Sequence, residues 1–335
     1  MSLMNDTFTA WRIPLYVLLE WPKADLEHPV IRRWSVPIYL ALWALGTVCL
    51  LGRSYARYQG RAGRLAIDDT ILGIAWIFAT ISIVTSIYGV LGAGFDRHVW
   101  DALVFGGRQG VAAWVHELTF IIGSSLAKAS VLVFYRRIFA PVKFSTMRWA
   151  VDFALFITLA FMTAISISII FACSPVHAFW DASNPTYGGK YHCFDRHIYD
   201  PIKGLISVIS DIFCLLLPQI VISRLKLETG ATLRLSIIFG CGILATLAGI
   251  ARTVELTRLY SDPLRDLTWV GHDVFLWAEV EIQLGIICAS VPMITTLFRP
   301  PSQAVQDMMK SKSAERESQQ PINNTTVQEL SNLNP

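Results

Sequence analysis

The chain has 335 residues, of which 53% are hydrophobic and 16% are charged, and its mean hydropathy is +0.48. Soluble domains carry roughly 25% charged residues, so this composition excludes an ordinary soluble protein and is typical of a polytopic membrane protein. The formal net charge of +3 is small and gives no reason to expect a nucleic-acid partner.

Seven apolar stretches follow one another along the chain. Each has roughly 17 to 25 residues, the length that an α-helix needs to cross the hydrocarbon core of a bilayer. The stretches occupy residues 36–52, 70–94, 111–135, 149–172, 202–222, 233–256 and 274–298. The sequence therefore predicts an all-α polytopic membrane protein with seven transmembrane helices, embedded in a lipid bilayer.

The segments outside this transmembrane domain, residues 36–298, have a different composition. Residues 1–35 precede the first apolar stretch and are predicted to form an extracellular N-terminal segment. Residues 299–335 are rich in Ser, Gln, Asn and Lys and contain few apolar residues. Such a segment buries too little apolar surface to fold, so we expect a disordered cytoplasmic tail.

Basic residues are distributed unevenly between the loops. Eleven lysines and arginines lie in the loops 53–69, 136–148 and 224–234, against six in the alternate loops, which are longer together. Because cytoplasmic loops carry the excess of Lys and Arg, the sequence predicts an extracellular N-terminus and a cytoplasmic C-terminus. The sequon Asn5-Asp6-Thr7 agrees with this orientation, since Asn5 can be glycosylated only on the outer side.

Two of the six cysteines fall outside the predicted helices. Cys173 and Cys193 bracket the largest outer loop, in an oxidising compartment where disulfides persist. We therefore predict a Cys173–Cys193 bridge that ties this loop to the top of the fourth helix, with two free thiols as the alternative. The other four cysteines lie inside helices, where a thiol behaves as a small hydrophobe.

Charged residues within the predicted helices are expected to face the bundle interior, because hydrocarbon does not solvate them. Helical spacing places Glu117 and Lys128 in one stripe of the third helix and Glu279 in one stripe with Gln283 on the seventh. The candidate ligand-binding residues are His116, Glu117, Arg252, Glu279, Glu281 and Gln283. A deeper buried polar network is predicted to contain Lys128, Asp152 and Asp211.

Glu279 and Glu281 point about 160° apart around their helix, so they cannot share one partner. We expect one of them to face a central cavity and the other to pair sideways, with Arg252 at matching depth as the counterion of either. Lys128 is expected to pair with Asp152 or Asp211. The alternative is that these charges only lock helices together, since a buried ion pair can specify packing without any ligand.

Several functional classes lack the residues that they need. A retinal Schiff base requires a lysine in the last helix, and the seventh helix has none. Zinc-protease, nucleophile-elbow and phosphate-loop motifs are absent, so no enzyme is predicted. The seven histidines lie in outer segments or outer helix ends, without a recognised metal-ligand spacing, and neither a metal nor another cofactor is expected.

A combination of motifs resembles the fungal rhodopsin-domain integral membrane proteins. These motifs are Asp68-Asp69, LAKASVL with FYRRIF at residues 126–139, CSPV with FWD at residues 173–181, Asp211 with Leu217-Pro218, Arg252, and WAEVE with CASVP at residues 277–292. The resemblance spans roughly residues 36–300. It implies a seven-helix protein in a group that includes candidate G-protein-coupled receptors for surface or nutrient cues.

The sequence leaves three functions open. The first is a receptor-like protein of the plasma membrane, in which an extracellular small ligand, cationic or polar, binds beneath the disulfide-linked loop and the basic loops face a cytoplasmic G protein. The second is a small-solute or ion transporter or channel, with Glu279, Asp211 and Lys128 as a polar path. The third is a membrane scaffold without a ligand. Pro218 and Pro292 lie near inner helix ends rather than at the midplane, which favours the receptor over a transporter.

Overall fold

A computed structural model describes residues 15–25, 27–60, 63, 65–102, 107–138, 145–181, 190–222 and 229–297. The predicted glycosylation site Asn5 and the predicted tail at 299–335 lie outside the described residues.

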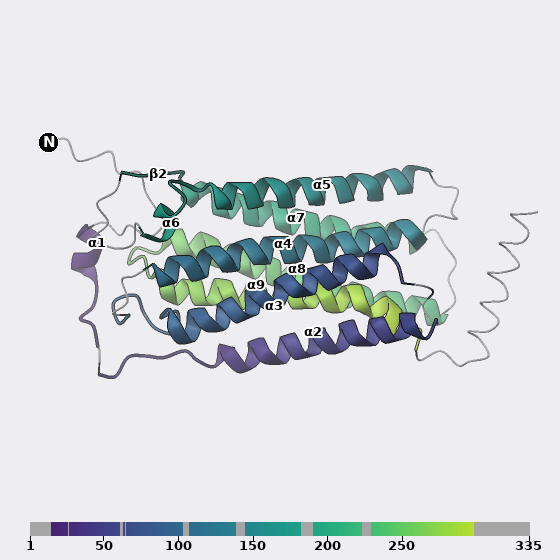
Figure 1. The fold of residues 1–335 in the computed structure, drawn as a ribbon, viewed down its shortest axis with the longest axis horizontal. Helices are drawn as coiled ribbons and strands as arrows, with labels where there is room; N and C mark the ends of the chain where they lie inside the picture. The colour runs from purple at the N-terminus through teal and green to yellow at the C-terminus, as the bar shows by residue number, and fades with distance from the viewer. Residues whose placement is uncertain are drawn as a thin grey trace, which may run out of the picture.

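Long helices make up most of the described chain. The helices are α1 (Leu15–Glu20), α2 (Ser35–Tyr58), α3 (Ile67–Gly92), α4 (Arg108–Ile138), α5 (Ser145–Ile170), α6 (Ala178–Asp181), α7 (Arg196–Ile222), α8 (Thr229–Ser261) and α9 (Leu267–Ile294). Two short strands, β1 (Cys173–Ser174) and β2 (His192–Cys193), pair with each other between α5 and α7. The long helices lie side by side in one bundle, so the predicted all-α class is confirmed (Figure 1).

Among the described residues, six helices are long and apolar enough to cross a membrane, namely α2, α3, α4, α5, α8 and α9. The chain is therefore a multi-pass membrane protein. The helix α7 runs along the same bundle but is not one of the six (Figure 1). The seventh crossing and the orientation in the membrane stay predictions.

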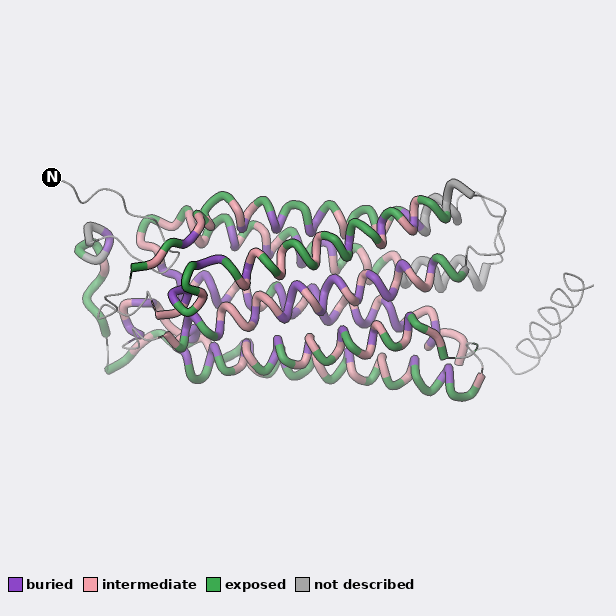
Figure 2. The backbone as a smooth tube through the Cα atoms, turned by 45° about the horizontal axis from the view of Figure 1, so that its top comes forward, coloured by how far each residue is buried: buried purple, intermediate pink, exposed green. Residues whose placement is uncertain are grey.

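The helix α9 is the centre of the bundle, because it contacts α2, α3, α4 and α8. Its residues are buried on several faces, and Glu279, Ile282 and Ile286 are at most 1% exposed. Figure 2 shows buried positions concentrated on the inner helices and exposed ones on the outer faces. A helix that is apolar almost all round fits this central place.

Large apolar side chains cover the outside of the bundle. Val48 and Leu51 on α2, Phe153 and Phe156 on α5, and Leu205 on α7 are all exposed. A water-soluble protein rarely exposes such a continuous apolar surface. In a bilayer these side chains meet lipid tails, while the backbone polar groups stay paired inside the helices.

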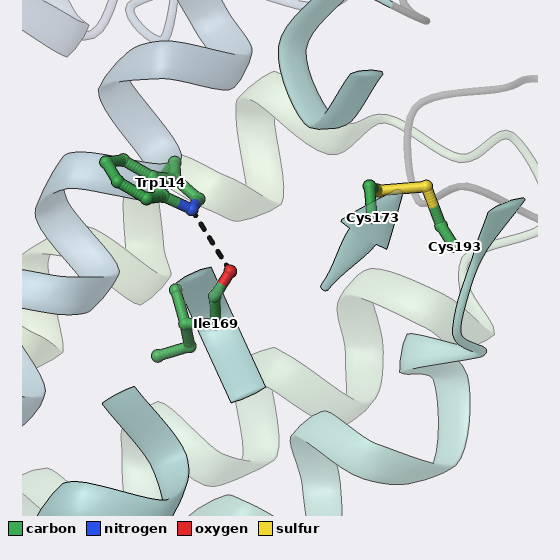
Figure 3. Close-up of a disulfide and its surroundings, with 4 residues drawn as sticks. All are labelled: Trp114, Ile169, Cys173 and Cys193. Atoms are coloured by element: carbon green, nitrogen blue, oxygen red, sulfur yellow. Dashed lines mark hydrogen bonds between the residues drawn. A yellow bond between two sulfur atoms is a disulfide. The ribbon is translucent and has the colours of Figure 1, made fainter. Parts of the chain in front are cut away.

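One end of the bundle carries β1, β2 and α6, and we call it the disulfide end. The predicted Cys173–Cys193 bridge is confirmed, and the two cysteines face each other across the paired strands (Figure 3). The nearby Trp114 Nε1 donates a hydrogen bond of 3.1 Å to the Ile169 carbonyl, which ties α4 to the end of α5 (Figure 3). A Cβ added at Gly110 would lie 2.8 Å from Trp180 Cα, so glycine allows α6 to pack directly on α4.

The segment before α2 crosses the same end. Arg32 Nη1 lies 3.0 Å from Asp273 Oδ1 on α9, and its guanidinium carbon lies 3.4 Å from the centre of the Trp269 ring. Arg33 Nε lies 2.9 Å from the carboxylate of Asp96, which is 1% exposed. These contacts hold the N-terminal segment against α9 and the turn that follows α3.

The opposite end carries a buried ionic cluster between α2 and α3. Arg53 and Arg57 each contact both Asp68 and Asp69, with Arg57 Nη2 2.8 Å from Asp68 Oδ2 and Arg53 Nε 2.7 Å from Asp69 Oδ1. Arg53 Nη1 also donates to the Ala289 carbonyl of α9 at 2.5 Å. The predicted basic loop therefore starts later than expected, because these two arginines lie inside the bundle.

Candidate ligand-binding site

Polar side chains gather around two cavities inside the bundle. The first, the disulfide-end cavity, has a volume of about 90 Å³ and lies between α4, α7, α8 and α9. Its polar lining consists of His116, Glu117, Arg196, Asp200, Lys203, Arg252 and Tyr260. Apolar side chains, among them Phe95, Phe120 and Phe275, supply the remaining walls.

An ionic cluster from α7 forms one wall of this cavity. Arg196, Asp200 and Lys203 follow one another at spacings of four and three, which puts them on one face of the helix. Arg196 Nη2 lies 2.6 Å from Glu117 Oε2 on α4 and 2.9 Å from Asp200 Oδ2, and Lys203 Nζ contacts both carboxylates. Tyr260 on α8 donates its hydroxyl hydrogen to Asp200. The cluster thus joins α4, α7 and α8 at the disulfide end.

A second cluster links α3, α4 and α9, and one of its members, His116, also lines this cavity. Ser82 Oγ and Ser86 Oγ donate hydrogen bonds of 2.6 and 3.0 Å to Glu279 Oε1. His116 Nδ1 lies 3.2 and 3.1 Å from the same two hydroxyl oxygens. All four side chains are almost completely buried. Glu279 is therefore held by two hydroxyl groups, with no arginine or lysine in contact among the described residues.

The second cavity, which we call the mid-bundle cavity, has a volume of about 80 Å³ and is lined by Lys128, Asp211 and Glu281. Lys128 Nζ lies 2.8 Å from Asp211 Oδ1 and donates to Ser207 Oγ at 3.3 Å. Glu281 Oε2 accepts a hydrogen bond of 2.8 Å from Arg252 Nε. The Arg252–Glu281 pair therefore lies between the two cavities, because Arg252 lines the first and Glu281 the second.

Close approach of α8 to these carboxylates depends on a glycine. A Cβ added at Gly249 would lie 3.1 Å from Glu281 Oε2 and 3.5 Å from Asp211 Oδ2. An alanine at Gly249 would require the Glu281 carboxylate to shift by a few tenths of an ångström, whereas its contact with Asp211 would be an ordinary one. The small residues that the sequence places on this helix thus serve both packing and the ionic network.

The structure brings three of the six candidate ligand-binding residues to the disulfide-end cavity, namely His116, Glu117 and Arg252. Glu281 lines the mid-bundle cavity instead, and Glu279 lines neither of the two cavities. Gln283 lies against α2, where its Oε1 would clash with a Cβ added at Gly46. The two adjacent glutamates thus separate as their angle around the helix requires, and Arg252 pairs with Glu281.

Of the two partners considered for Lys128, the structure places Asp211 beside it. Asp152 lies elsewhere, with its Oδ1 2.8 Å from Arg136 Nε, and its side chain is 39% exposed. Its exposed position near the start of α5 separates it from the buried network. The predicted network thus holds Lys128 and Asp211 together and leaves Asp152 outside.

Sequence reasoning missed Arg196, Asp200, Lys203 and Tyr260. The fifth apolar stretch starts at residue 202, so the sequence assigns the first turns of α7 to the preceding loop. The available signal was the spacing of Arg196, Asp200 and Lys203, which places alternating charges on one face of a helix that continues upstream. Among the described residues, no group of three His, Cys, Asp or Glu side chains is arranged to hold a metal ion.

Comparisons with known proteins agree with this architecture. Residues 52–300 match the family described as the fungal rhodopsin domain. The chain is 31% identical over 298 residues to the fugralins biosynthesis cluster protein 2 of Gibberella zeae, a match that covers 82% of this chain and 68% of that protein. No solved structure matches.

Two further relatives have different names. The SAT4 family membrane protein of Emericella nidulans is 30% identical over 52% of this chain and 42% of its own length. The receptor GIN3 of Arthrobotrys oligospora is 24% identical over 81% of this chain and 64% of its own length. The chain thus spans between about two fifths and two thirds of these relatives.

Proposed function

Because the chain belongs to the fungal rhodopsin domain family, we propose that it is a seven-helix receptor of the plasma membrane that senses an extracellular small molecule. The observation that carries this proposal is the disulfide-end cavity, an interior space lined by ionic groups from α4, α7 and α8. Polar groups that converge in a mostly apolar cavity are the usual mark of a small-molecule site.

The disulfide-linked loop lies next to this cavity. Phe179 of α6 packs on Arg196, with 5.2 Å between the guanidinium carbon and the ring centre. Cys193 comes three residues before Arg196, so the bridge fixes the start of the helix that carries the ionic cluster. A ligand that moves Arg196 would therefore also act on the loop and on α7.

The Arg252–Glu281 pair offers a route from the cavity toward the opposite end. Glu281 shares the mid-bundle cavity with Asp211, and Asp211 pairs with Lys128 of α4. Further along α4, Arg136 and Arg137 are exposed at the opposite end. We propose that this end faces the cytoplasm and contacts a G protein, in agreement with the predicted positive-inside orientation. The name of the relative GIN3 as a receptor gives independent support.

A transporter or channel is the second candidate, because the mid-bundle cavity contains carboxylate oxygens without hydrogen-bond donors. Asp211 Oδ2 and Glu281 Oε1 have no partner among the described residues. Buried acidic groups of this kind mark ion paths in many membrane proteins. In the described bundle, however, the two cavities are separated by the Arg252–Glu281 pair.

The two candidates make different predictions in cells and in liposomes. Cells that express the full chain with reporters for cyclic AMP and calcium would be challenged with a library of small acids, amines and neutral molecules. We expect at least one compound to give a response with the wild type and with Arg258→Gln, a surface control whose side chain is 63% exposed. The response should be lost with Arg196→Gln, because this change removes one of the two cations that bind Glu117 and Asp200.

The contradicting result is transport without signalling. If an active compound enters proteoliposomes that contain only this protein, and no second-messenger response occurs in cells, the transporter is the better assignment. If Arg196→Gln responds like the wild type, the disulfide-end cavity is not the binding site.

A further inference from the structure

Every carboxylate oxygen around the disulfide-end cavity already accepts a hydrogen bond from a side chain of the protein. Both oxygens of Glu117 accept hydrogen bonds from Arg196, at 2.7 and 2.6 Å. Asp200 Oδ1 accepts from Arg196 at 3.0 Å and from Lys203 at 2.9 Å, and Asp200 Oδ2 accepts from Tyr260. A cationic ligand would therefore have to compete with the arginine and the lysine that already bind these carboxylates.

The unsatisfied atoms of this cavity are all nitrogens. Among the described residues, His116 Nε2, Arg196 Nε and Arg252 Nη2 are buried and have no hydrogen-bond partner. His116 and Arg252 are each only 3% exposed. The His116 imidazole and the Arg252 guanidinium both lie near the Phe120 ring. A buried polar atom without a partner costs free energy, which a ligand with the complementary groups would recover.

The hydrogen bonds around Glu279 determine what His116 presents to the cavity. Ser82 and Ser86 each have one hydroxyl hydrogen. Ser82 donates it to Glu279 Oε1, and Ser86 has Glu279 Oε1 and the Ser82 backbone carbonyl as acceptors at 3.0 and 3.1 Å. Their oxygens are then acceptors, so His116 Nδ1 carries the hydrogen that faces them. In the neutral ring the other nitrogen, Nε2, is consequently a proton acceptor. The cavity thus combines N–H donors from two arginines with one proton-accepting nitrogen.

We infer that the disulfide-end cavity binds a compact carboxylic acid with an apolar body. One acid oxygen accepts a hydrogen bond from Arg252 Nη2, and the other brings its proton to His116 Nε2. When this proton passes to Nε2, the acid becomes a carboxylate between an imidazolium and a guanidinium, so charge is conserved. Hydrogen bonds between charged groups are roughly twice as strong as those between neutral groups. This inference names the ligand class for the proposed function and rests on it.

The remaining walls suit the apolar part of such an acid. Phe275 packs on Phe95 with 4.8 Å between ring centres, and on His116 with 4.1 Å. The cavity of about 90 Å³ is smaller than the roughly 300–1,000 Å³ of sites for drug-sized molecules. A cavity of about 150 Å³ holds benzene, so this one fits a short-chain acid, or the acidic head of an aromatic or longer molecule.

The experiment uses the full chain purified in detergent and measures its thermal-unfolding midpoint with millimolar benzoate, phenylacetate and hexanoate. Each acid is paired with its primary amide, its methyl ester and the amine of matching size. We expect the acids to raise the midpoint most and the amides less, because an amide offers both hydrogen-bonding groups without charge. Esters and amines should have no effect, since an ester lacks the proton and an amine adds positive charge.

Two cavity variants and one control make the test specific. His116→Asn keeps an amide N–H for the two serines and removes Nε2, and Arg252→Lys keeps the charge for Glu281 and removes Nη2. Each should weaken acid binding by roughly 10- to 100-fold, the loss expected for one charged hydrogen bond. Arg57→Lys changes an equally buried arginine of the opposite end and should bind the acids like the wild type.

Several outcomes would overturn the inference. The first is that amines or esters raise the unfolding midpoint of the wild type as much as the acids do. The second is that the acids stabilise the two cavity variants as much as the wild type. The third is that none of the three acids stabilises the wild type. The proposed function fails separately. A second-messenger response to a compound other than an acid would support the receptor function and contradict the assignment of an acid as its ligand. Acid binding without any cellular response would support the binding site and contradict the receptor function.

Discussion

Asp96, at the disulfide end, is a buried carboxylate that pairs with two arginines. Arg33 and Arg97 each place Nε 2.9 Å from its carboxylate, and the Arg32 backbone N–H donates to its carbonyl at 2.7 Å. Burial raises the pKa of Asp96, but the hydrogen bonds and charges of Arg97 and Arg33 lower it by more, so that it lies below its ordinary value of 3.8.

This depressed pKa predicts a specific pH dependence. The ionised Asp96 contributes its full stability above pH 3.8, the ordinary value of its pKa, and loses it as the pH falls through the lower pKa of the folded state. We expect Asp96→Asn to cost about 1–3 kcal/mol at pH 7, the range for losing charged hydrogen bonds. The measurement is the thermal-unfolding midpoint of both proteins between pH 7 and pH 3. A difference that stays constant over this range would contradict the assignment.

At the scale of single residues, the sequence indicates which side chains are buried better than it indicates their partners. Charge inside an apolar stretch was enough to select Glu279, Glu281, Arg252 and Lys128. It could not distinguish the partners of Lys128, because Asp152 and Asp211 both lie at plausible depth along their helices. The choice depends on the rotation of α5 and α7 about their axes, which packing between helices determines.

The disulfide-linked loop is the element that closes the bundle next to the candidate site. The bridge joins residues separated by 20 positions, and closing a loop of this size stabilises a fold by about 3 kcal/mol in the chain-entropy account. We expect Cys173→Ser with Cys193→Ser to lower the thermal-unfolding midpoint and to weaken acid binding, since α7 starts directly after the bridge. Cys49→Ser, which breaks no bond, is the matched control.

The outcome that contradicts this role is also measurable. If the double serine variant binds the acid panel like the wild type, the loop stabilises the fold without shaping the cavity. If it unfolds at the same temperature as the wild type, the loop holds its place through the contact of Trp180 with Gly110 and Trp114 instead.

At the scale of elements, apolar length predicts the existence of every long helix but places the start of each one too late in the chain. The largest differences are at α7 and α9, which start at Arg196 and Leu267 rather than at residues 202 and 274. Their first turns carry charged or polar residues that belong to the bundle interior at its end. Hydropathy cannot recognise such turns, because it does not take account of a partner on another helix.

The whole molecule is predicted to have its disulfide end outside the cell. Single cysteines at Lys190, an exposed residue shortly before β2, and at Tyr58, which is 87% exposed at the end of α2, would test this. A membrane-impermeant maleimide added to intact cells should label Lys190→Cys, and should label Tyr58→Cys only after the membrane is opened. The reverse pattern would invert the orientation.

The same assay tests the seventh crossing. With the natural cysteines otherwise retained, Lys226→Cys should behave like Tyr58→Cys if α7 crosses the membrane. Labelling of Lys226→Cys in intact cells would show that the chain does not cross between residues 190 and 226. Orientation can be predicted from the sequence because it follows the basic residues of the loops. The arrangement of helices around α9 cannot be predicted in this way.

The guanidinium of Arg53 reaches three helices at once, since it binds the two aspartates of α3 and the carbonyl of Ala289 on α9 from its own place on α2. One buried side chain therefore joins these three helices at the end opposite the disulfide. Two further buried pairs lie outside this junction, since Arg252 joins α8 to Glu281 of α9 and Lys128 joins α4 to Asp211 of α7. If the protein signals as proposed, a movement of α7 and α8 would lengthen these two salt bridges. The three helices that Arg53 joins are expected to keep their mutual arrangement.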